Sequence, residues 1–186
     1  MRQLYFITSN KGKFLEAAEK LRPYGYRVVQ KDLGYPEIQA DCLTDVVTWA
    51  VSEIKERFDK AFMIEDAGVF IDSLQGFPGV FSKYAFFTIG LSGILRLLQG
   101  EENRQAVFRS VYAYSEPERT PVIVTGECIG TIAGKQRGSY GFGYDPIFIP
   151  NNEEKTFGEM TIEEKNRYSH RAKALEKLIG VLNTKP

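Results

Sequence analysis

Short β-rich apolar runs alternate along the chain with segments of helical spacing, and this order restricts the chain to mixed α/β folds. Residues 4–7 predict a buried strand, and residues 14–21 predict a helix that Pro23 and Gly25 end. A second strand is expected at residues 27–30. A long amphipathic helix is expected at residues 43–58, followed by another buried strand at residues 61–64.

The second half of the chain continues in the same mixed style. Residues 69–71 can extend the preceding strand, residues 76–79 predict a turn, and residues 89–98 predict a helix. Residues 106–114 and 122–132 predict two neighbouring strands, and residues 133–144 form a glycine-rich loop. Thr161 and Glu164 have the spacing of a capping box, and the last helix is expected at about residues 169–182. Without repeats or linkers, residues 1–186 predict a single α/β domain.

Composition limits the classes of partner. The 186 residues include 43% hydrophobic residues, enough for a sizeable core without disulfides. Lysine plus arginine equals aspartate plus glutamate at 24 each, so the basic excess of a general nucleic-acid binder is missing. An acidic small molecule can still bind a local basic cluster. Cys42 and Cys128 form no framework spacing and are expected to be reduced thiols.

The hydropathy pattern argues against a membrane protein. No apolar run reaches the roughly 20 residues that cross a bilayer. The N-terminal apolar stretch is only about four residues, too short for a signal peptide. We therefore expect a cytoplasmic protein with neither a membrane nor a nucleic-acid partner.

A polar, glycine-containing loop joins the first predicted strand to the first predicted helix. This arrangement points backbone N–H groups and the positive end of a helix at an anion. Lys11 and Lys13 add full positive charge at the same place. The loop suits a phosphate chain, although it lacks the spacing of a P-loop. It consists of Thr8, Ser9, Asn10, Lys11, Gly12 and Lys13.

Two neighbouring carboxylates, Glu65 and Asp66, are expected at the end of a buried strand. Carboxylates in such a place can hold Mg²⁺, which prefers oxygen ligands, and can orient or deprotonate a water molecule. Glu37 is a further acidic residue in a loop-like stretch.

A glycine-bracketed aromatic segment, Phe142-Gly143-Tyr144-Asp145-Pro146, is the most informative motif. An aromatic face can stack on a nucleobase, which is worth about 1–3 kcal/mol. The following proline is expected to keep Asp145 extended, where its carboxylate can accept hydrogen bonds.

Near the C-terminus, Lys165, His170 and Arg171 offer hydrogen-bond donors for a phosphate or a purine keto oxygen. Taken singly, each of these four segments also fits an ordinary structural role. The phosphate loop can be an exposed turn, the carboxylates can be surface charges, the aromatic segment can be a core turn, and the histidine can be structural.

Together and in this order, the segments resemble the inosine/xanthosine triphosphate pyrophosphatases, also called Ham1-like non-canonical purine NTP pyrophosphatases. The resemblance runs from residue 4 to about residue 182. The matching motifs are Thr-Ser-Asn-Lys-Gly-Lys at 8–13, Glu-Asp-Ala-Gly at 65–68, Gly-Phe-Pro-Gly-Val at 76–80, Gly-Phe-Gly-Tyr-Asp-Pro at 141–146 and Ser-His-Arg at 169–171. Ala67 stands where the family usually has serine, and Thr48-Trp49-Ala50 stands where it often has Asn-Ala.

The resemblance implies a long, curved mixed β-sheet with helices packed around it, two lobes that form a central nucleotide cleft, and a homodimer. It implies hydrolysis of ITP, dITP or XTP between the α- and β-phosphates, with Mg²⁺ as cofactor.

The resemblance also implies a role for each matching residue. Asp66 is implied as general base and metal ligand, with Glu37 as a second metal ligand. The residues implied to bind the substrate are Thr8, Ser9, Asn10, Lys11, Gly12, Lys13, Ala67, Phe142, Gly143, Tyr144, Asp145, Lys165, His170 and Arg171.

Selectivity for a 6-keto purine has a physical basis. A keto oxygen accepts hydrogen bonds from donors such as His170, Arg171 or backbone N–H groups, whereas the 6-amino group of adenine leaves these donors unpaired. Such mismatches can discriminate by about 10⁴–10⁵-fold. Two alternatives stay open: a Maf-like pyrophosphatase for modified nucleotides, and a nucleotide-binding module without catalysis.

Overall fold

The computed structural model describes residues 1–36 and 38–183, which divide into two compact units. Unit 1 comprises Met1–Asp66, Ser110–Gly126 and His170–Pro186, and unit 2 comprises Ala67–Arg109 and Glu127–Ser169. The chain passes between the units within three strands, β3 (Phe62–Ile71), β4 (Gln105–Ser115) and β5 (Val122–Ile132).

Over the described residues, six strands form one mixed sheet in the order β2-β1-β3-β4-β5-β6. β1 (Arg2–Ile7) pairs in parallel with β2 (Tyr26–Lys31) and with β3, whereas β5 pairs antiparallel with β6 (Phe148–Pro150). The mixed α/β fold expected from the sequence is therefore confirmed.

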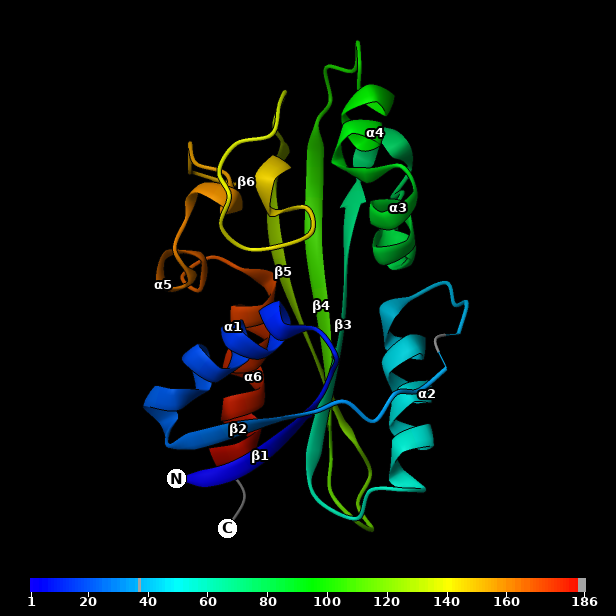
Figure 1. Ribbon diagram of the computed structural model, residues 1–186, viewed down its shortest axis with the longest axis vertical. Helices are drawn as coiled ribbons and strands as arrows, with labels where there is room; N and C mark the ends of the chain where they lie inside the picture. The colour runs from blue at the N-terminus through cyan, green and yellow to red at the C-terminus, as the bar shows by residue number, and fades with distance from the viewer. Residues whose placement is uncertain (37, 184–186) are drawn as a thin grey trace. The chain divides into compact units, whose positions relative to one another are not determined.

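In unit 1, α1 (Lys11–Leu21) connects β1 to β2 and lies beside α6 (His170–Asn183), as Figure 1 shows. The 3₁₀ turn η1 (Arg22–Tyr24) follows α1, and α2 (Leu43–Lys55) buries the apolar face predicted from its spacing. The main core of this unit consists of Leu4, Phe6, Ala17, Leu21, Tyr26, Val28, Met63, Tyr112, Tyr114, Ala174, Leu175, Leu178, Ile179 and Leu182.

In unit 2, the short helices α3 (Ser82–Thr88) and α4 (Gly90–Leu97) follow the 3₁₀ turns η2 (Asp72–Leu74) and η3 (Gly79–Phe81). The turns η4 (Asp145–Ile147) and η5 (Phe157–Glu159) flank β6, and α5 (Ile162–Lys165) comes next. The sequence did not reveal α3 or β6, which are too short for a clear periodic signal. The core of this unit consists of Val69, Ile71, Ile94, Leu98, Ala106, Phe108, Cys128, Ile132, Tyr144, Ile147, Phe148, Phe157 and Met160.

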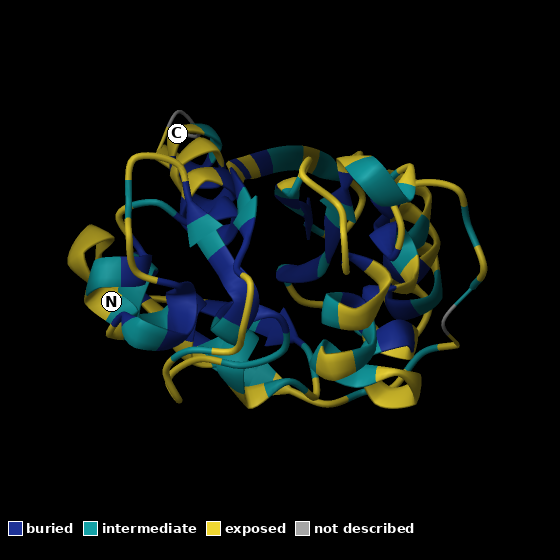
Figure 2. Cartoon of the chain, turned by 90° about the horizontal axis from the view of Figure 1, so that it is seen from above, coloured by how far each residue is buried: buried dark blue, intermediate teal, exposed yellow. Residues whose placement is uncertain are grey.

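Burial follows the regular elements. Figure 2 shows that buried residues concentrate in the strands and on the inner faces of the helices, whereas exposed residues gather in loops and outer helix turns. Both cysteines are free, as expected; Cys42 is exposed and Cys128 is buried.

β3 corrects one expectation from the sequence. Glu65 and Asp66 were expected at a strand end, but β3 continues through them to Ile71. The β-rich run Val69-Phe70-Ile71 is part of the same strand, so the two carboxylates lie in its middle.

Within residues 1–36 and 38–183, no single helix is long and apolar enough to cross a membrane. One pair of helical segments, residues 79–88 and 90–97, passes that test of length and composition together but is bent by 116°.

Candidate active site

The predicted phosphate loop forms the N-terminal end of α1. The helix begins at Lys11, earlier than the apolar spacing indicated, because Asn10 acts as its N-cap and accepts a hydrogen bond from the Lys13 N–H at 3.0 Å. The Asn10 N–H donates to the Thr8 hydroxyl at 3.1 Å, and Gln30 donates to the Thr8 carbonyl at 2.9 Å. The first turn of an eleven-residue helix therefore presents N–H groups and two lysines at the end of β1.

Lys13 connects this loop to the carboxylates of β3. Its ammonium lies 2.8 Å from Glu65 Oε2 and 3.7 Å from Asp66 Oδ1, and it also donates to the Glu65 carbonyl at 3.2 Å. The Asp66 side chain is 27% exposed, whereas that of Glu65 is fully enclosed. Of the two carboxylates, Asp66 is the one within reach of a substrate or a metal ion.

Glu65 is the functional candidate that sequence reasoning left without a role. Its Oε1 accepts hydrogen bonds from the Ser110 hydroxyl at 2.7 Å and from Arg171 Nε at 3.0 Å. Burial alone would raise the pKa of Glu65, but the charges of Lys13 and Arg171 and hydrogen bonds from Lys13 and Ser110 lower it below its ordinary value. Its position beside Asp66 in an apolar run was the only sequence signal.

His170 and Arg171 open α6, and both are buried in unit 1. Besides its bond to Glu65, Arg171 donates through Nη1 to Glu16 Oε2 at 3.2 Å. The structure thus places the Arg171 guanidinium in a buried ion-pair network, a setting that the sequence did not predict.

The aromatic segment and Lys165 lie in unit 2. Lys165 and Asp145 form an ion pair of 2.6 Å in which each side chain is only 2% exposed. The Lys165 ammonium also lies 5.1 Å from the centroid of the Phe142 ring. Asp145 Oδ2 accepts a hydrogen bond from the Phe142 N–H at 2.8 Å, so one carboxylate fixes both the aromatic residue and the lysine.

Asp145 is not extended, as the following proline had suggested. It is the first residue of η4, because its carboxylate closes the turn onto the Phe142 N–H and pairs with Lys165. Tyr144 is buried, and its hydroxyl donates to the Ser82 carbonyl at 2.8 Å. Burial also raises the pKa of this hydroxyl.

Ala67 lies in β3 and is partly exposed. Glu37, predicted as a metal ligand, lies outside the described residues. Over residues 1–36 and 38–183, no group of three or more histidine, cysteine, aspartate or glutamate side chains has the arrangement of a metal site. Asp66 is a partly exposed oxygen donor of the kind that Mg²⁺ prefers.

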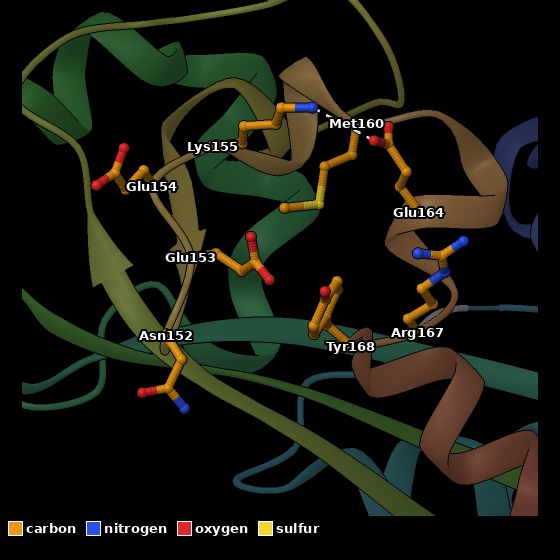
Figure 3. Close-up of a pocket in the computed structure, with 8 residues that line it drawn as sticks. All are labelled: Asn152, Glu153, Glu154, Lys155, Met160, Glu164, Arg167 and Tyr168. Atoms are coloured by element: carbon orange, nitrogen blue, oxygen red, sulfur yellow. Dashed lines mark hydrogen bonds and ion pairs between the residues drawn. The ribbon is translucent and has the colours of Figure 1, made fainter.

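Unit 2 also contains an open pocket of about 350 Å³. Figure 3 shows charged side chains around it, including the Lys155–Glu164 ion pair of 3.3 Å. It is lined by Asn152, Glu153, Glu154, Lys155, Met160, Glu164, Arg167 and Tyr168. None of these eight residues belongs to the predicted site.

Comparison with known proteins settles the family. A model of the Ham1 family matches residues 4–181, almost the whole chain. The chain belongs to the Ham1 family. It is similar to the dITP/XTP pyrophosphatase of Pyrococcus horikoshii, with 52% identity over 94% of this chain and 93% of that protein. It is also similar to the dITP/XTP pyrophosphatase of Thermococcus kodakarensis, with 51% identity over 97% of each chain.

Solved structures of similar proteins have the same fold. A HAM1 protein from Coxiella burnetii matches with a TM-score of 0.84 and 29% identity over the full length of both chains. A nucleoside-triphosphatase / dITP/XTP pyrophosphatase from Mycobacterium abscessus matches with a TM-score of 0.70 and 30% identity, covering 95% of this chain and 98% of that one.

Proposed function

We propose that the protein hydrolyses non-canonical purine nucleoside triphosphates, ITP, dITP and XTP, to the monophosphate and pyrophosphate. The names of its Ham1 relatives support this substrate class. The observation that carries the chemistry is the convergence of the α1 N-terminus, Lys13 and the partly exposed Asp66 in unit 1.

In the proposed reaction, a water oxygen forms a bond to the α-phosphorus, and the bond from that phosphorus to the oxygen bridging to the β-phosphate breaks. Pyrophosphate leaves with the bridging oxygen. Asp66 orients the water and accepts its proton. Lys11, Lys13 and the N–H groups of residues 8–13 hold the phosphates, because phosphoryl transfer depends mainly on positioning and charge neutralisation.

We propose Asp66 and Glu37 as ligands of a divalent cation, Mg²⁺. This ion usually binds through one or two carboxylates together with substrate phosphates. When bound, it would neutralise charge on the phosphate oxygens.

We propose that the base is held by the aromatic segment of unit 2 together with His170 and Arg171 of unit 1. Phe142 is proposed to stack on the purine, with Gly143 and Asp145 beside it and Tyr144 contributing through its backbone, since its hydroxyl is engaged with Ser82. Lys165 and Ala67 are proposed as further substrate contacts. His170 and Arg171 are proposed to act near the 6-keto oxygen, with Arg171 held by Glu65 and Glu16.

One assay tests this function. Pyrophosphate release is measured with ITP, dITP, XTP, ATP, GTP, dUTP and 5-methyl-UTP, with Mg²⁺ and with EDTA. We expect Mg²⁺-dependent turnover of ITP, dITP and XTP and a kcat/KM for ATP that is lower by at least about 10²-fold. Preference for the pyrimidines would favour a Maf-like enzyme, and binding without release would indicate a non-catalytic module.

Asp66→Asn tests the role of the base. The amide cannot accept the proton, so turnover of ITP should fall by about 10²–10⁴-fold. Asp72→Asn is the matched control, because Asp72 is an exposed aspartate just beyond the end of β3. Near-normal turnover of the Asp66 variant would contradict the assignment.

We further propose that residues 1–186 work as one catalytic domain, that the working form is a homodimer, and that it acts in the cytoplasm on the nucleotide pool. The resemblance to the Ham1-like pyrophosphatases supports these points. Light scattering of the purified protein should give twice the mass of one chain, and a monomeric mass would contradict the dimer.

A further inference from the structure

Four charged side chains of unit 1 form a series of three ion pairs beside the phosphate loop. Lys13 pairs with Glu65 at 2.8 Å, Glu65 with Arg171 at 3.0 Å, and Arg171 with Glu16 at 3.2 Å. Lys13 and Glu16 lie three residues apart on α1, so the last member returns to the helix that carries the first. This series of ion pairs therefore joins α1 to β3 and to the start of α6.

The four side chains in this series of ion pairs are enclosed, except for Lys13. The side chains of Glu65, Glu16 and Arg171 are 0%, 4% and 6% exposed, whereas that of Lys13 is 17% exposed. Two carboxylates and two cations balance in charge, which is the condition under which buried ions persist. Buried ion pairs often add little net stability, so stability alone does not account for this arrangement. Lys13, the accessible member, lies in the predicted phosphate loop.

Glu65 is the centre of this arrangement. One of its oxygens is fixed by Ser110 and Arg171, and the other lies against the Lys13 ammonium. The Lys13 ammonium is 0.9 Å closer to Glu65 than to Asp66, as the 2.8 Å and 3.7 Å distances show. Glu65 is therefore the main counter-ion of Lys13, and Asp66 is the more distant one.

We propose that Glu65 is a positioning residue, which holds Lys13 in place for the phosphate chain while Ser110, Arg171 and Glu16 fix Glu65. The inference rests on the proposed function, because it takes Lys13 to bind phosphate. Because the Glu65 side chain is fully enclosed, it acts on the phosphate chain through the lysine.

The test is a double-mutant cycle made of Glu65→Gln, Lys13→Met and the double variant. KM and kcat for ITP with Mg²⁺ are measured, together with the Kd of inorganic pyrophosphate by calorimetry. We expect Glu65→Gln to raise KM and the pyrophosphate Kd by about tenfold and to change kcat less, because the phosphate contact is what is displaced. When Lys13 is already replaced by methionine, Glu65→Gln should raise KM and the pyrophosphate Kd by less than about twofold.

Matched controls come from the same unit. Glu176→Gln and Lys20→Met remove an ion pair of 2.6 Å between α6 and the same helix α1, in which Glu176 is 55% exposed. Both should leave KM and the pyrophosphate Kd within about twofold of wild type. If Glu65→Gln does not fold, Ser110→Ala removes one anchor of Glu65 without changing charge and should raise KM about threefold.

Several outcomes would overturn the inference. A lower kcat with unchanged KM would indicate a general structural role, and effects that multiply in the double variant would show that Glu65 does not act through Lys13. Wild-type protein that releases no pyrophosphate from any triphosphate refutes the proposed function alone, because the pyrophosphate Kd still tests Glu65. Wild-type protein that does not bind pyrophosphate refutes the positioning role.

Discussion

At the scale of single residues, Gly141 shows how one backbone position sets the geometry of the aromatic segment. Its φ is +71°, and a Cβ there would lie 2.0 Å from Asp145 Oδ2. That oxygen also bonds to the Phe142 N–H and to Lys165. Any side chain at position 141 must therefore displace the carboxylate that organises the segment.

Gly141→Ala should lower the free energy of unfolding by about 3–5 kcal/mol, because it combines backbone strain with the disruption of a buried ion pair. Gly143→Ala is the matched control, since its φ is +62° but a Cβ would meet no atom within 4 Å. The control should cost about 1–2 kcal/mol from strain alone. Urea denaturation compares the two, and equal losses would contradict the clash with Asp145.

At the scale of elements, β5 and α6 approach closely in unit 1. A Cβ on Gly126 would lie 2.1 Å from the His170 carbonyl oxygen and 2.3 Å from the Ala174 nitrogen. The backbone of α6 is thus in direct contact with β5 at Gly126. This contact fixes the position of the start of α6, which carries His170 and Arg171.

Gly126→Ala should destabilise the protein by about 1–3 kcal/mol, because α6 must shift to admit a methyl group. Gly180→Ala on the same helix should instead stabilise it by about 0.5–1 kcal/mol, since no atom lies within 4 Å and alanine favours a helix. Denaturant midpoints measure both. A neutral Gly126→Ala would show that the contact is looser than described.

Two capping boxes start η5 and α5 in unit 2. The Glu159 and Glu164 carboxylates accept hydrogen bonds from the backbone N–H groups of Thr156 and Thr161, each at 2.8 Å. These backbone hydrogen bonds lower the pKa of both glutamates. Their contribution to stability is present above their unfolded pKa of 4.5 and is lost as the pH falls through the lower folded value.

The double variant Glu159→Gln with Glu164→Gln removes this titration, because an amide oxygen can still accept the hydrogen bond. We expect its thermal midpoint to fall less than that of wild type between about pH 5 and about pH 3. Glu163→Gln changes a residue of α5 outside the capping box, so its thermal midpoint should depend on pH as that of wild type does. Parallel curves for all three proteins would contradict the prediction.

At the scale of the whole molecule, the proposed substrate contacts are distributed over both units. The triphosphate residues, Asp66, His170 and Arg171 belong to unit 1, and the aromatic segment and Lys165 belong to unit 2. A nucleotide that binds these residues in the folded chain should raise its free energy of unfolding.

A non-hydrolysable ITP analogue with Mg²⁺, at about 100 times its Kd, should raise the free energy of unfolding by about 2.7 kcal/mol. The matching ATP analogue at the same concentration should raise it less, because it leaves the donors for the keto oxygen unpaired. Thermal melts followed at the single tryptophan and by circular dichroism measure the shift. Equal shifts with both analogues would argue against 6-keto selectivity.

Most of the fold and the family could be predicted from the sequence. The apolar spacing of α2 and α6, the β-rich runs of β4 and β5 and the capping box at Thr161 are local signals, so they could be predicted without tertiary information. The ordered motifs likewise indicated the Ham1 family. Short or non-periodic elements such as α3 and β6 gave no comparable signal.

Only the tertiary structure decided what the charged residues do to one another. Sequence spacing cannot show that Glu65 is enclosed by Lys13, Ser110 and Arg171, since these lie on three other elements. Nor can it show that Asp145 is committed to Phe142 and Lys165. The aromatic segment was predicted to hold a nucleobase, and the structure adds that its aspartate is buried and holds the segment together. The sequence could not show this, because charge pairing depends on distances that only long-range packing determines.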